Sequence, residues 1–337
     1  MRGNVLFLCV FFLMIPVFDC IAAPNYRIEI LQVANIEPYE ASYQGFIEEL
    51  KKEGLIDGKT ATITRHIIDA DADASIWEKI SILFKLKKLA GKVIDLKPDL
   101  VLTIGTVTSK YSMEKFVDAG IPVVFTAVAN PLVLGCKDIK TPGKGFTGST
   151  LYLDPLVVLT LTQMAYPKLK TLGMICSDDD NGITFIEETK KKSGSLGITV
   201  ISKQVKKSAS ILPAAEELYK AGAEAFGIPL DTYYGLRDNE PCRELDVFSR
   251  ERKIPNFVYI GYQTKGGVLY MGADFNYIGR LAALQSVKIL TKGIKPETLP
   301  ILKQEELTIY YDQERLDGLG MKLPPQIQKI SKKAVFK

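Results

Sequence analysis

The chain has 337 residues, of which 47% are hydrophobic and 24% charged, and its formal net charge is +4. This length suits two lobes of about 120–150 residues, each able to bury a core of its own. The charge is far from the clustered basic face of a nucleic-acid-binding protein, so we expect no nucleic-acid partner.

The N-terminus is typical of a secretory signal peptide. Arg2 precedes an uncharged, almost wholly apolar stretch at 5–18, which ends in small residues. The stretch is shorter than the ~20 residues of a membrane span. We therefore expect residues 1–23 to be removed, leaving a periplasmic or otherwise extracytoplasmic chain that does not span the membrane. Two alternatives stay open, an uncleaved anchor and lipid attachment at Cys20, although the residues before Cys20 fit a lipobox poorly.

Strand and helix signals alternate from Asn25 onward. Short strands rich in Val, Ile and Leu are expected at 27–33, 61–67, 99–104 and 122–128. Helices are expected between them at 43–53, 76–95 and 109–118. The lysines of the second helix, Lys85, Lys87, Lys88 and Lys92, are expected on a solvated face. This order is typical of βαβ units, with a parallel sheet covered by helices on both faces.

The same alternation starts again after a loop at 142–145 and an extended segment at 146–151. Strands are expected at 171–176, 197–203, 224–228, 256–260 and 268–271. Helices are expected at 185–193, 212–221 and 234–253. No flexible linker separates the two halves. We therefore predict two doubly wound α/β lobes with parallel sheets, joined by several short crossings.

Polar residues follow the carboxyl ends of the predicted strands, which is where open parallel sheets bind ligands. Hydroxyls near a helix start can bind a carboxylate, an acid from the other lobe can bind an ammonium group, and tyrosines can stack on a flat ligand. Each residue could instead cap a helix or end a strand. The predicted ligand-binding set is Asn35, Glu37, Tyr39, Thr106, Thr108, Ser109, Asn130, Ser149, Ser177, Asp178, Asp231, Tyr262 and Asp274.

Signals for catalysis are weak. The single histidine, His66, lies on a predicted strand, and the chain has no Gly-x-Ser-x-Gly elbow. The stretch 143–148 matches Gly-x-Gly-x-x-Gly, but it enters a strand and opens no helix. We therefore expect no enzyme activity, no metal and no cofactor.

Three cysteines remain beyond the N-terminal segment, namely Cys136, Cys176 and Cys242. Their spacing is not that of a metal site, and an odd number cannot all pair. We expect small buried hydrophobic side chains, with one disulfide as the open alternative.

Several stretches, in order along the chain, resemble one known family. They are 30–32, 45–50 with Gly54, 97–101, 121–128, 146–149, 154–155, 172–174, 229–232, 272–275 and Gly279. The run Pro-Val-Val-Phe-Thr-Ala-Val at 122–128, with its following Asn130-Pro131, is the most specific of them. Over roughly residues 27–320 the sequence resembles the ABC-transporter substrate-binding proteins that include tryptophan- and tyrosine-binding members.

The resemblance implies a type I periplasmic-binding fold with three crossings between the lobes, near Ser149, Phe275 and Glu305. One lobe would hold 25–148 and 276–304, and the other 149–275 and 305–337. It also implies a monomer that captures a small-molecule ligand, such as an aromatic amino acid, by hinge closure. Its partners would be the permease and ATPase subunits of an ABC importer. A ligand-binding sensor module that signals through a membrane partner has the same fold and is the alternative.

The sequence departs from the family pattern at two candidate positions. Asn130 stands where the family commonly has aspartate, and Leu230 precedes Asp231 where the family often has threonine. Losing the carboxylate at Asn130 weighs against an ammonium-bearing ligand, whereas Asp231 keeps that ligand in consideration.

Overall fold

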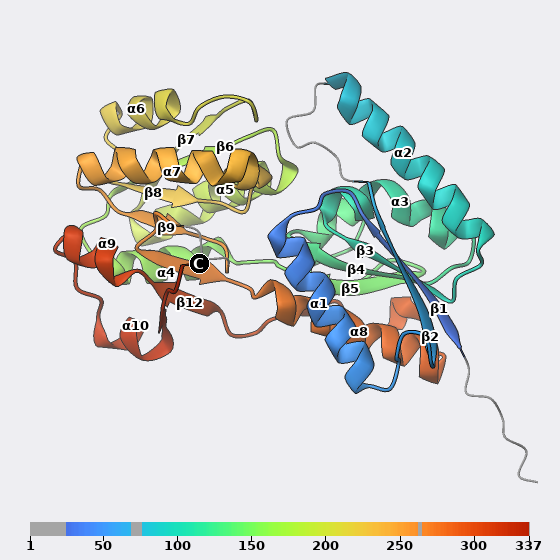
Figure 1. The fold of residues 1–337 in the computed structure, drawn as a ribbon. Helices are drawn as coiled ribbons and strands as arrows, with labels where there is room; N and C mark the ends of the chain where they lie inside the picture. The colour runs from blue at the N-terminus through green and yellow to red at the C-terminus, as the bar shows by residue number, and fades with distance from the viewer. Residues whose placement is uncertain (1–24, 69–75, 262–264, 337) are drawn as a thin grey trace, which may run out of the picture.

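The computed structural model describes residues 25–68, 76–261 and 265–336, apart from the side chains of 76–79. Two α/β lobes lie side by side, each built on one sheet (Figure 1). The expected signal peptide, Cys20 and Tyr262 lie outside the described residues.

The first sheet has the strand order β11-β5-β4-β3-β1-β2, and all its pairs are parallel. Its strands are β1 (Tyr26–Gln32), β2 (Ala61–Ile67), β3 (Leu100–Ile104), β4 (Val123–Val128), β5 (Phe146–Thr150) and β11 (Leu302–Lys303). Every residue of β3, β4 and β5 is buried, as expected for central strands covered on both faces. The strand order reverses between β1 and β3, which is where doubly wound sheets open a crevice for ligands.

Helices cover both faces of this sheet. They are α1 (Glu37–Lys52), α2 (Ile76–Asp95), α3 (Thr106–Asp118) and α8 (Phe275–Lys292), with short 3-10 turns η1 (Pro131–Leu134) and η4 (Pro296–Thr298). The helices α1 and α8 pack on each other over one core cluster, and α2 and α3 share another. A Cβ added at Gly45 would lie 2.0 Å from Asn276 O, and one at Gly279 would lie 1.9 Å from Ser42 O. Only glycine therefore permits this approach of α1 to α8.

The second sheet has the order β13-β12-β10-β9-β8-β6-β7. Its strands are β6 (Thr171–Cys176), β7 (Thr199–Gln204), β8 (Ala225–Ile228), β9 (Asn256–Val258), β10 (Leu269–Gly272), β12 (Thr308–Tyr311) and β13 (Lys332–Lys333). Its helices are α4 (Pro155–Ala165), α5 (Asp180–Ser193), α6 (Leu212–Lys220), α7 (Leu236–Glu251), α9 (Gln313–Gly318) and α10 (Pro325–Ile330), with the 3-10 turns η2 (Gly194–Leu196) and η3 (Thr232–Gly235). The order of the first five strands repeats that of the first lobe, so the predicted fold class is confirmed.

Two strands depart from the predicted all-parallel pattern. β12 runs antiparallel to β10, and β13 runs parallel to β12. The chain leaves β10 toward the first lobe and comes back to β12 from β11, at the edge of the first sheet. β12 therefore starts at the end of the sheet where β10 finishes, and the two strands run in opposite directions. The chain passes between the two sheets along 151–154, 273–274 and 304–307.

Three helices start earlier than the sequence pattern predicts. α1 begins at Glu37, six residues before the predicted start at 43. α5 begins at Asp180, where the side chain of Asp179 accepts a hydrogen bond from Asn181 N. α3 begins at Thr106, which places Ser109 inside the helix instead of at its start. The predicted helix 234–253 divides into η3 and α7, and Arg237, Asp238 and Asn239 near the start of α7 have a left-handed backbone conformation.

Cys136, Cys176 and Cys242 are all buried, and no disulfide joins any two of them. In the described part of the chain no helix is both long and apolar enough to cross a bilayer.

Candidate functional site

A pocket lies between the two lobes, where their strand ends meet. The carboxyl end of β4 supplies Ala129 and Asn130, the first passage between the sheets supplies 151–153, and the second lobe supplies α5 and the ends of β8 and β9. The atom-free space is about 540 Å³, part of it open to solvent.

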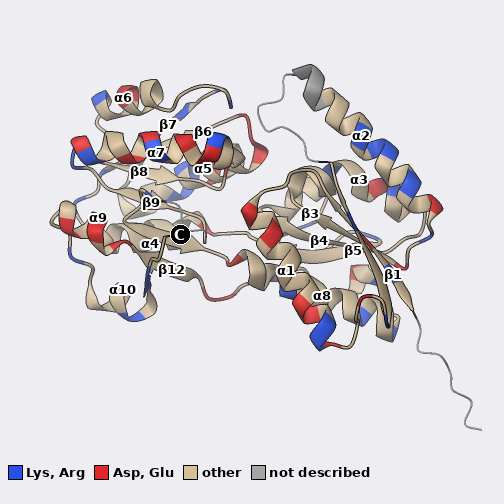
Figure 2. Cartoon of the chain, viewed as in Figure 1, with Lys and Arg blue, Asp and Glu red and all other residues tan. Residues whose placement is uncertain are grey.

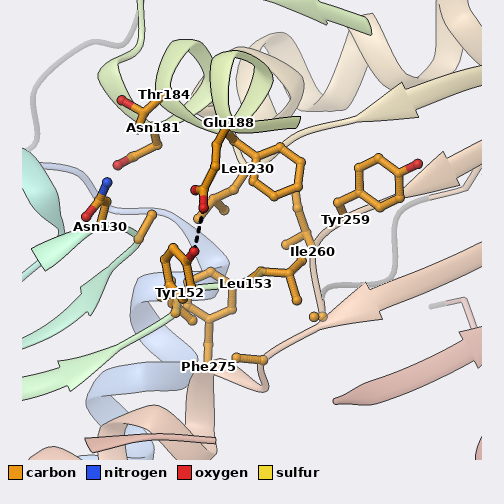
Figure 3. A pocket seen from close by; sticks show the side chains of 16 residues that line it. Asn130, Tyr152, Leu153, Asn181, Thr184, Glu188, Leu230, Tyr259, Ile260 and Phe275 are labelled. Carbon is orange, nitrogen blue, oxygen red and sulfur yellow. Dashed lines mark hydrogen bonds between the residues drawn. The ribbon is translucent and has the colours of Figure 1, made fainter. Parts of the chain in front are cut away.

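The walls of the pocket are mainly apolar. Leu153, Leu230, Ile260 and Phe275 surround it (Figure 3). Phe185 belongs to the same lining. Such walls favour a ligand that carries an apolar or aromatic body.

Glu188 is the one charged residue in the lining that the structure describes. Its Oε1 atom accepts a hydrogen bond from Tyr152 OH at 2.6 Å and lies 2.7 Å from Lys192 Nζ (Figure 3). Both partners use the same oxygen, so Oε2 has no hydrogen-bond partner among the described residues, and the side chain is 26% exposed. The free oxygen can accept a hydrogen bond from a ligand.

The protonation state of Tyr152 is fixed by its surroundings. Burial, followed by the hydrogen bond to Glu188, raises the pKa of Tyr152 to about 12. The phenol therefore stays protonated at neutral pH and donates to the carboxylate. Lys192 also contacts Asp154 Oδ1 at 2.9 Å, which anchors its ammonium beside Glu188.

Two amide side chains also line the pocket. Asn130 Oδ1 accepts from Leu132 N at 3.0 Å, and Asn181 Oδ1 accepts from Thr106 Oγ1 at 3.1 Å. Neither amide N–H group has a partner among the described residues, and the same holds for the Thr184 hydroxyl. These donors lie where they can contact an anionic or carbonyl oxygen of a ligand.

Two contacts cross from lobe to lobe near this pocket. They are the Thr106–Asn181 hydrogen bond and an ion pair of Lys110 Nζ with Asp180 Oδ2 at 2.7 Å. Both connect the start of α3 with the start of α5. The lobes are therefore in contact across the cleft.

A pair of acids lies deeper in the second lobe. Asp231 is 3% exposed and accepts hydrogen bonds from Ser177 N, Ser177 Oγ and Tyr233 N at 2.6, 2.8 and 2.8 Å. Burial, followed by the negative charge of Asp179, raises the pKa of Asp231 to about 6. Burial, followed by the same charge of Asp179, also raises the pKa of Tyr39 from the first lobe. Asp231 thus ties the ends of β6 and β8 together.

The profile of a family described as ABC transporter substrate binding protein matches residues 27–335. The chain belongs to this family. It is therefore a substrate-binding protein of an ABC transporter. No curated protein matches the chain.

Solved structures of similar fold include other substrate-binding proteins. An ABC domain from Streptococcus pneumoniae in complex with L-Trp is 21% identical, with a TM-score of 0.74 over 91% of this chain and 99% of that one. A substrate-binding protein with adhesive properties from Clostridium difficile, in a ligand-free open structure, is 22% identical, with a TM-score of 0.72 over 92% and 100%. A leucine-binding protein from Thermotoga maritima is 14% identical, with a TM-score of 0.58 over 79% and 83%. At these identities the likeness concerns the fold alone.

The sequence-predicted residues of this substrate-binding protein fall into separate groups. Asn130 lines the pocket, and Thr106 contacts Asn181 across the cleft. Glu37 and Asp274 line a second, more open hollow between the lobes, while Asn35 and Asp178 lie on the surface.

The remaining predicted hydroxyls are buried and bonded within their own lobe. Thr108 accepts from Val33 N at 3.2 Å, and Ser109 donates to Gly105 O at 2.9 Å. Ser149 donates to Ile278 O at 2.8 Å, and Ser177 bonds to Asp231. Their observed contacts hold the strand ends in place.

Sequence reasoning missed the polar face of α5. Asn181, Thr184 and Glu188 follow one another at helical spacing, so they share the face that lines the pocket. The spacing is visible in the sequence once the helix starts at Asp180. With the helix predicted to start at 185, Asn181 and Thr184 were assigned to the preceding loop, and their shared face with Glu188 was not recognised.

Proposed function

We propose that the protein captures a small amphipathic molecule in this pocket and delivers it to an ABC importer. After removal of residues 1–23 it would act outside the cytoplasm as a monomer, with the permease and ATPase as partners. The ligand would be bound and released without chemical change. The family match supports the transporter role, and the apolar walls around one unsatisfied carboxylate oxygen support the binding site.

The ligand class that fits this arrangement best is an aromatic amino acid or a similar compact solute. Its ammonium group would bind Glu188 Oε2, which has no other described partner. Its carboxylate would accept from the amides of Asn130 and Asn181, and its side chain would contact Phe185 and Phe275. Charge-assisted hydrogen bonds of this kind are roughly twice as strong as neutral ones.

Binding would be coupled to closure of the lobes. We propose that the elements of the first sheet move as one lobe and those of the second sheet as the other, close to the predicted divisions at 148/149, 275/276 and 304/305. A ligand that contacts Asn130 in the first lobe and Glu188 in the second interacts fully only when the lobes are together. It would therefore shift the population toward the closed form, which the permease would recognise.

A thermal-shift screen of the purified chain against amino acids, nucleosides, sugars and small peptides tests this proposal. A ligand at 100 times its Kd stabilises the fold by about 2.7 kcal/mol, which is a clear rise in Tm. We expect the largest rise with aromatic amino acids. A hit in another class alone would contradict the amino-acid assignment. Binding without ligand uptake by cells that carry the transporter would favour the sensor alternative.

A further inference from the structure

The buried side of α2 defines which of its residues face outward. Leu86, Ala90 and Val93 are fully buried and pack in the core cluster shared with α3. A helix turns by about 100° per residue, so the residues near Phe84 and Lys88 point the opposite way. We call the resulting surface the outward face of α2. It comprises the exposed residues Ile80, Ser81, Phe84, Lys85, Lys87, Lys88, Lys92 and Asp95, so it carries four lysines and one acid.

The centre of the outward face is apolar. Phe84 is 70% exposed, more than any other described aromatic side chain, and Ile80 one turn earlier is 41% exposed. Lys87 lies to one side of Phe84 at helical spacing, and Lys85, Lys88 and Lys92 lie to the other. The surface is thus an aromatic side chain flanked by cations.

The lysines of the outward face are not neutralised by the residues that the structure describes. None of the four lies in an ion pair with a described side chain, and Asp95 at the helix end is the single acid between 80 and 95. Lys115 of α3 adds a further cation, since its Nζ donates to Lys87 O at 3.2 Å. Figure 2 shows the resulting run of basic residues along α2. Figure 1 shows α2 on the outer side of its lobe, with its N-terminal part reaching beyond the sheet.

We propose that the outward face of α2 binds the surface of an anionic phospholipid membrane. Basic helices with exposed aromatic residues lie in the headgroup region, where the lysines meet lipid phosphates and the aromatic ring enters the acyl boundary. The charge complementarity favours anionic lipid over a protein partner. This contact would hold the binding protein flat against the membrane that contains its transporter.

Each lysine near an anionic surface strengthens membrane binding by about fivefold. Replacing Lys85, Lys87, Lys88 and Lys92 by glutamine is therefore expected to weaken binding by roughly two orders of magnitude or more. Salt should weaken it too, because these charges are exposed and the screening length is about 10 Å at 0.1 M. Phe84→Ser keeps the charge and removes the apolar contact, so it should weaken binding by a smaller factor.

The test is co-sedimentation of the chain without residues 1–23 with two kinds of vesicle. One kind is phosphatidylcholine alone, and the other is phosphatidylcholine mixed with phosphatidylglycerol. The matched control removes the same charge far from α2, by glutamine substitution of the exposed Lys322, Lys329, Lys332 and Lys333. Circular dichroism melting confirms that each variant is folded.

We expect the wild-type chain and the control variant to bind the mixed vesicles and not phosphatidylcholine alone. The α2 lysine variant should stay in solution, and the Phe84→Ser variant should bind more weakly. A wild-type chain that ignores both vesicles overturns the proposal. Equal loss in the control and α2 variants also overturns it, because binding would then follow net charge alone. A defect of the α2 variant in docking to the purified permease, without any vesicle binding by the wild type, would assign the surface to a protein partner instead.

Discussion

Lys110 Nζ in the first lobe lies 2.7 Å from Asp180 Oδ2 in the second, so an ion pair connects the second turn of α3 with the first turn of α5. One turn before Lys110, Thr106 Oγ1 donates to Oδ1 of Asn181, the residue after Asp180, at 3.1 Å. The side chains of Lys110 and Asp180 are 35% and 55% exposed, so the pair contributes little to stability by itself. Its position matters more than its strength, because it can form only when the lobes are together.

The first prediction concerns this ion pair. Asp180→Asn should weaken ligand binding by about fivefold or less, since an exposed ion pair contributes at most about 1 kcal/mol. High salt should lower the ligand affinity of the wild type by a similar factor, because it screens the attraction between the two exposed charges. Isothermal titration calorimetry at low and high salt measures both. Glu187→Gln is the control, because Glu187 pairs with Lys190 within α5 and makes no contact between lobes. An equal salt effect in the wild type and in Asp180→Asn would show that the ion pair does not favour closure.

The second prediction concerns the packing of α8 against α1. Gly279→Ala places a Cβ 1.9 Å from Ser42 O, so the two helices must separate, and we expect the free energy of unfolding to fall by about 3 kcal/mol. Gly91→Ala in α2 is the matched control. A Cβ there meets nothing within 4 Å, and alanine should raise the free energy of unfolding by up to about 1 kcal/mol. Urea denaturation of both variants makes the comparison. Equal stability would contradict the close packing that joins 276–304 to the first lobe.

The third prediction concerns pH and Asp231. Its pKa is about 6 in the folded state and near 3.8 when unfolded, so the folded chain holds the proton more tightly. The contribution of Asp231 to stability is therefore greatest below about pH 4 and is lost as the pH rises to about 6. Asp231→Asn should remove this part of the pH dependence. The free energy of unfolding is measured against pH for the wild type and for Asp231→Asn. The difference between the two curves isolates Asp231, since other carboxyls such as Asp154, with a lowered pKa, titrate in both proteins. A difference that grows in favour of the wild type with rising pH would contradict the prediction.

The fourth prediction concerns the thiols. Burial raises the pKa of Cys136 to about 11 and that of Cys176 to about 12, and Cys242 is buried as well. Thiolate is the reactive form, so all three should react slowly with a thiol reagent near pH 8 in the folded chain and quickly in denaturant. One fast thiol in the folded chain would contradict the burial of that cysteine.

Much of the fold could be predicted because its strands are short, apolar and separated by helices. The parallel direction of β1 to β5 and of β6 to β10 follows from that alternation. The direction of β12 could not be predicted in the same way, because it depends on the chain returning from β11 in the other lobe. The residues of β12 alone cannot indicate the direction of this strand, because that direction is set by where β11 lies.

The candidate site was predicted less completely than the fold. The strand-end rule selected Asn130, which lines the pocket, but it also selected Ser109 and Ser149, which are hydrogen-bonded inside the first lobe. Whether a hydroxyl faces the cleft depends on the residue at which each helix starts. α5 starts at Asp180, more than one turn before the predicted start at 185, and only the earlier start puts Asn181 and Glu188 on the same helix. The polar spacing along α5 was present in the sequence, whereas the free oxygen of Glu188 could be identified only from its two neighbours.

The most direct test of the account is the affinity of tryptophan and tyrosine for three chains, measured by isothermal titration calorimetry. They are the wild type, Glu188→Gln and the control Glu187→Gln, whose side chain lies on the exposed surface of α5. Glutamine at 188 keeps an acceptor for Tyr152 and removes the charge that would bind the ligand ammonium. Losing a charged hydrogen bond of about 2–3 kcal/mol should raise Kd by roughly 30- to 150-fold in Glu188→Gln, with the control unchanged. Wild-type affinity in Glu188→Gln would contradict the assignment of this pocket as the ligand-binding site.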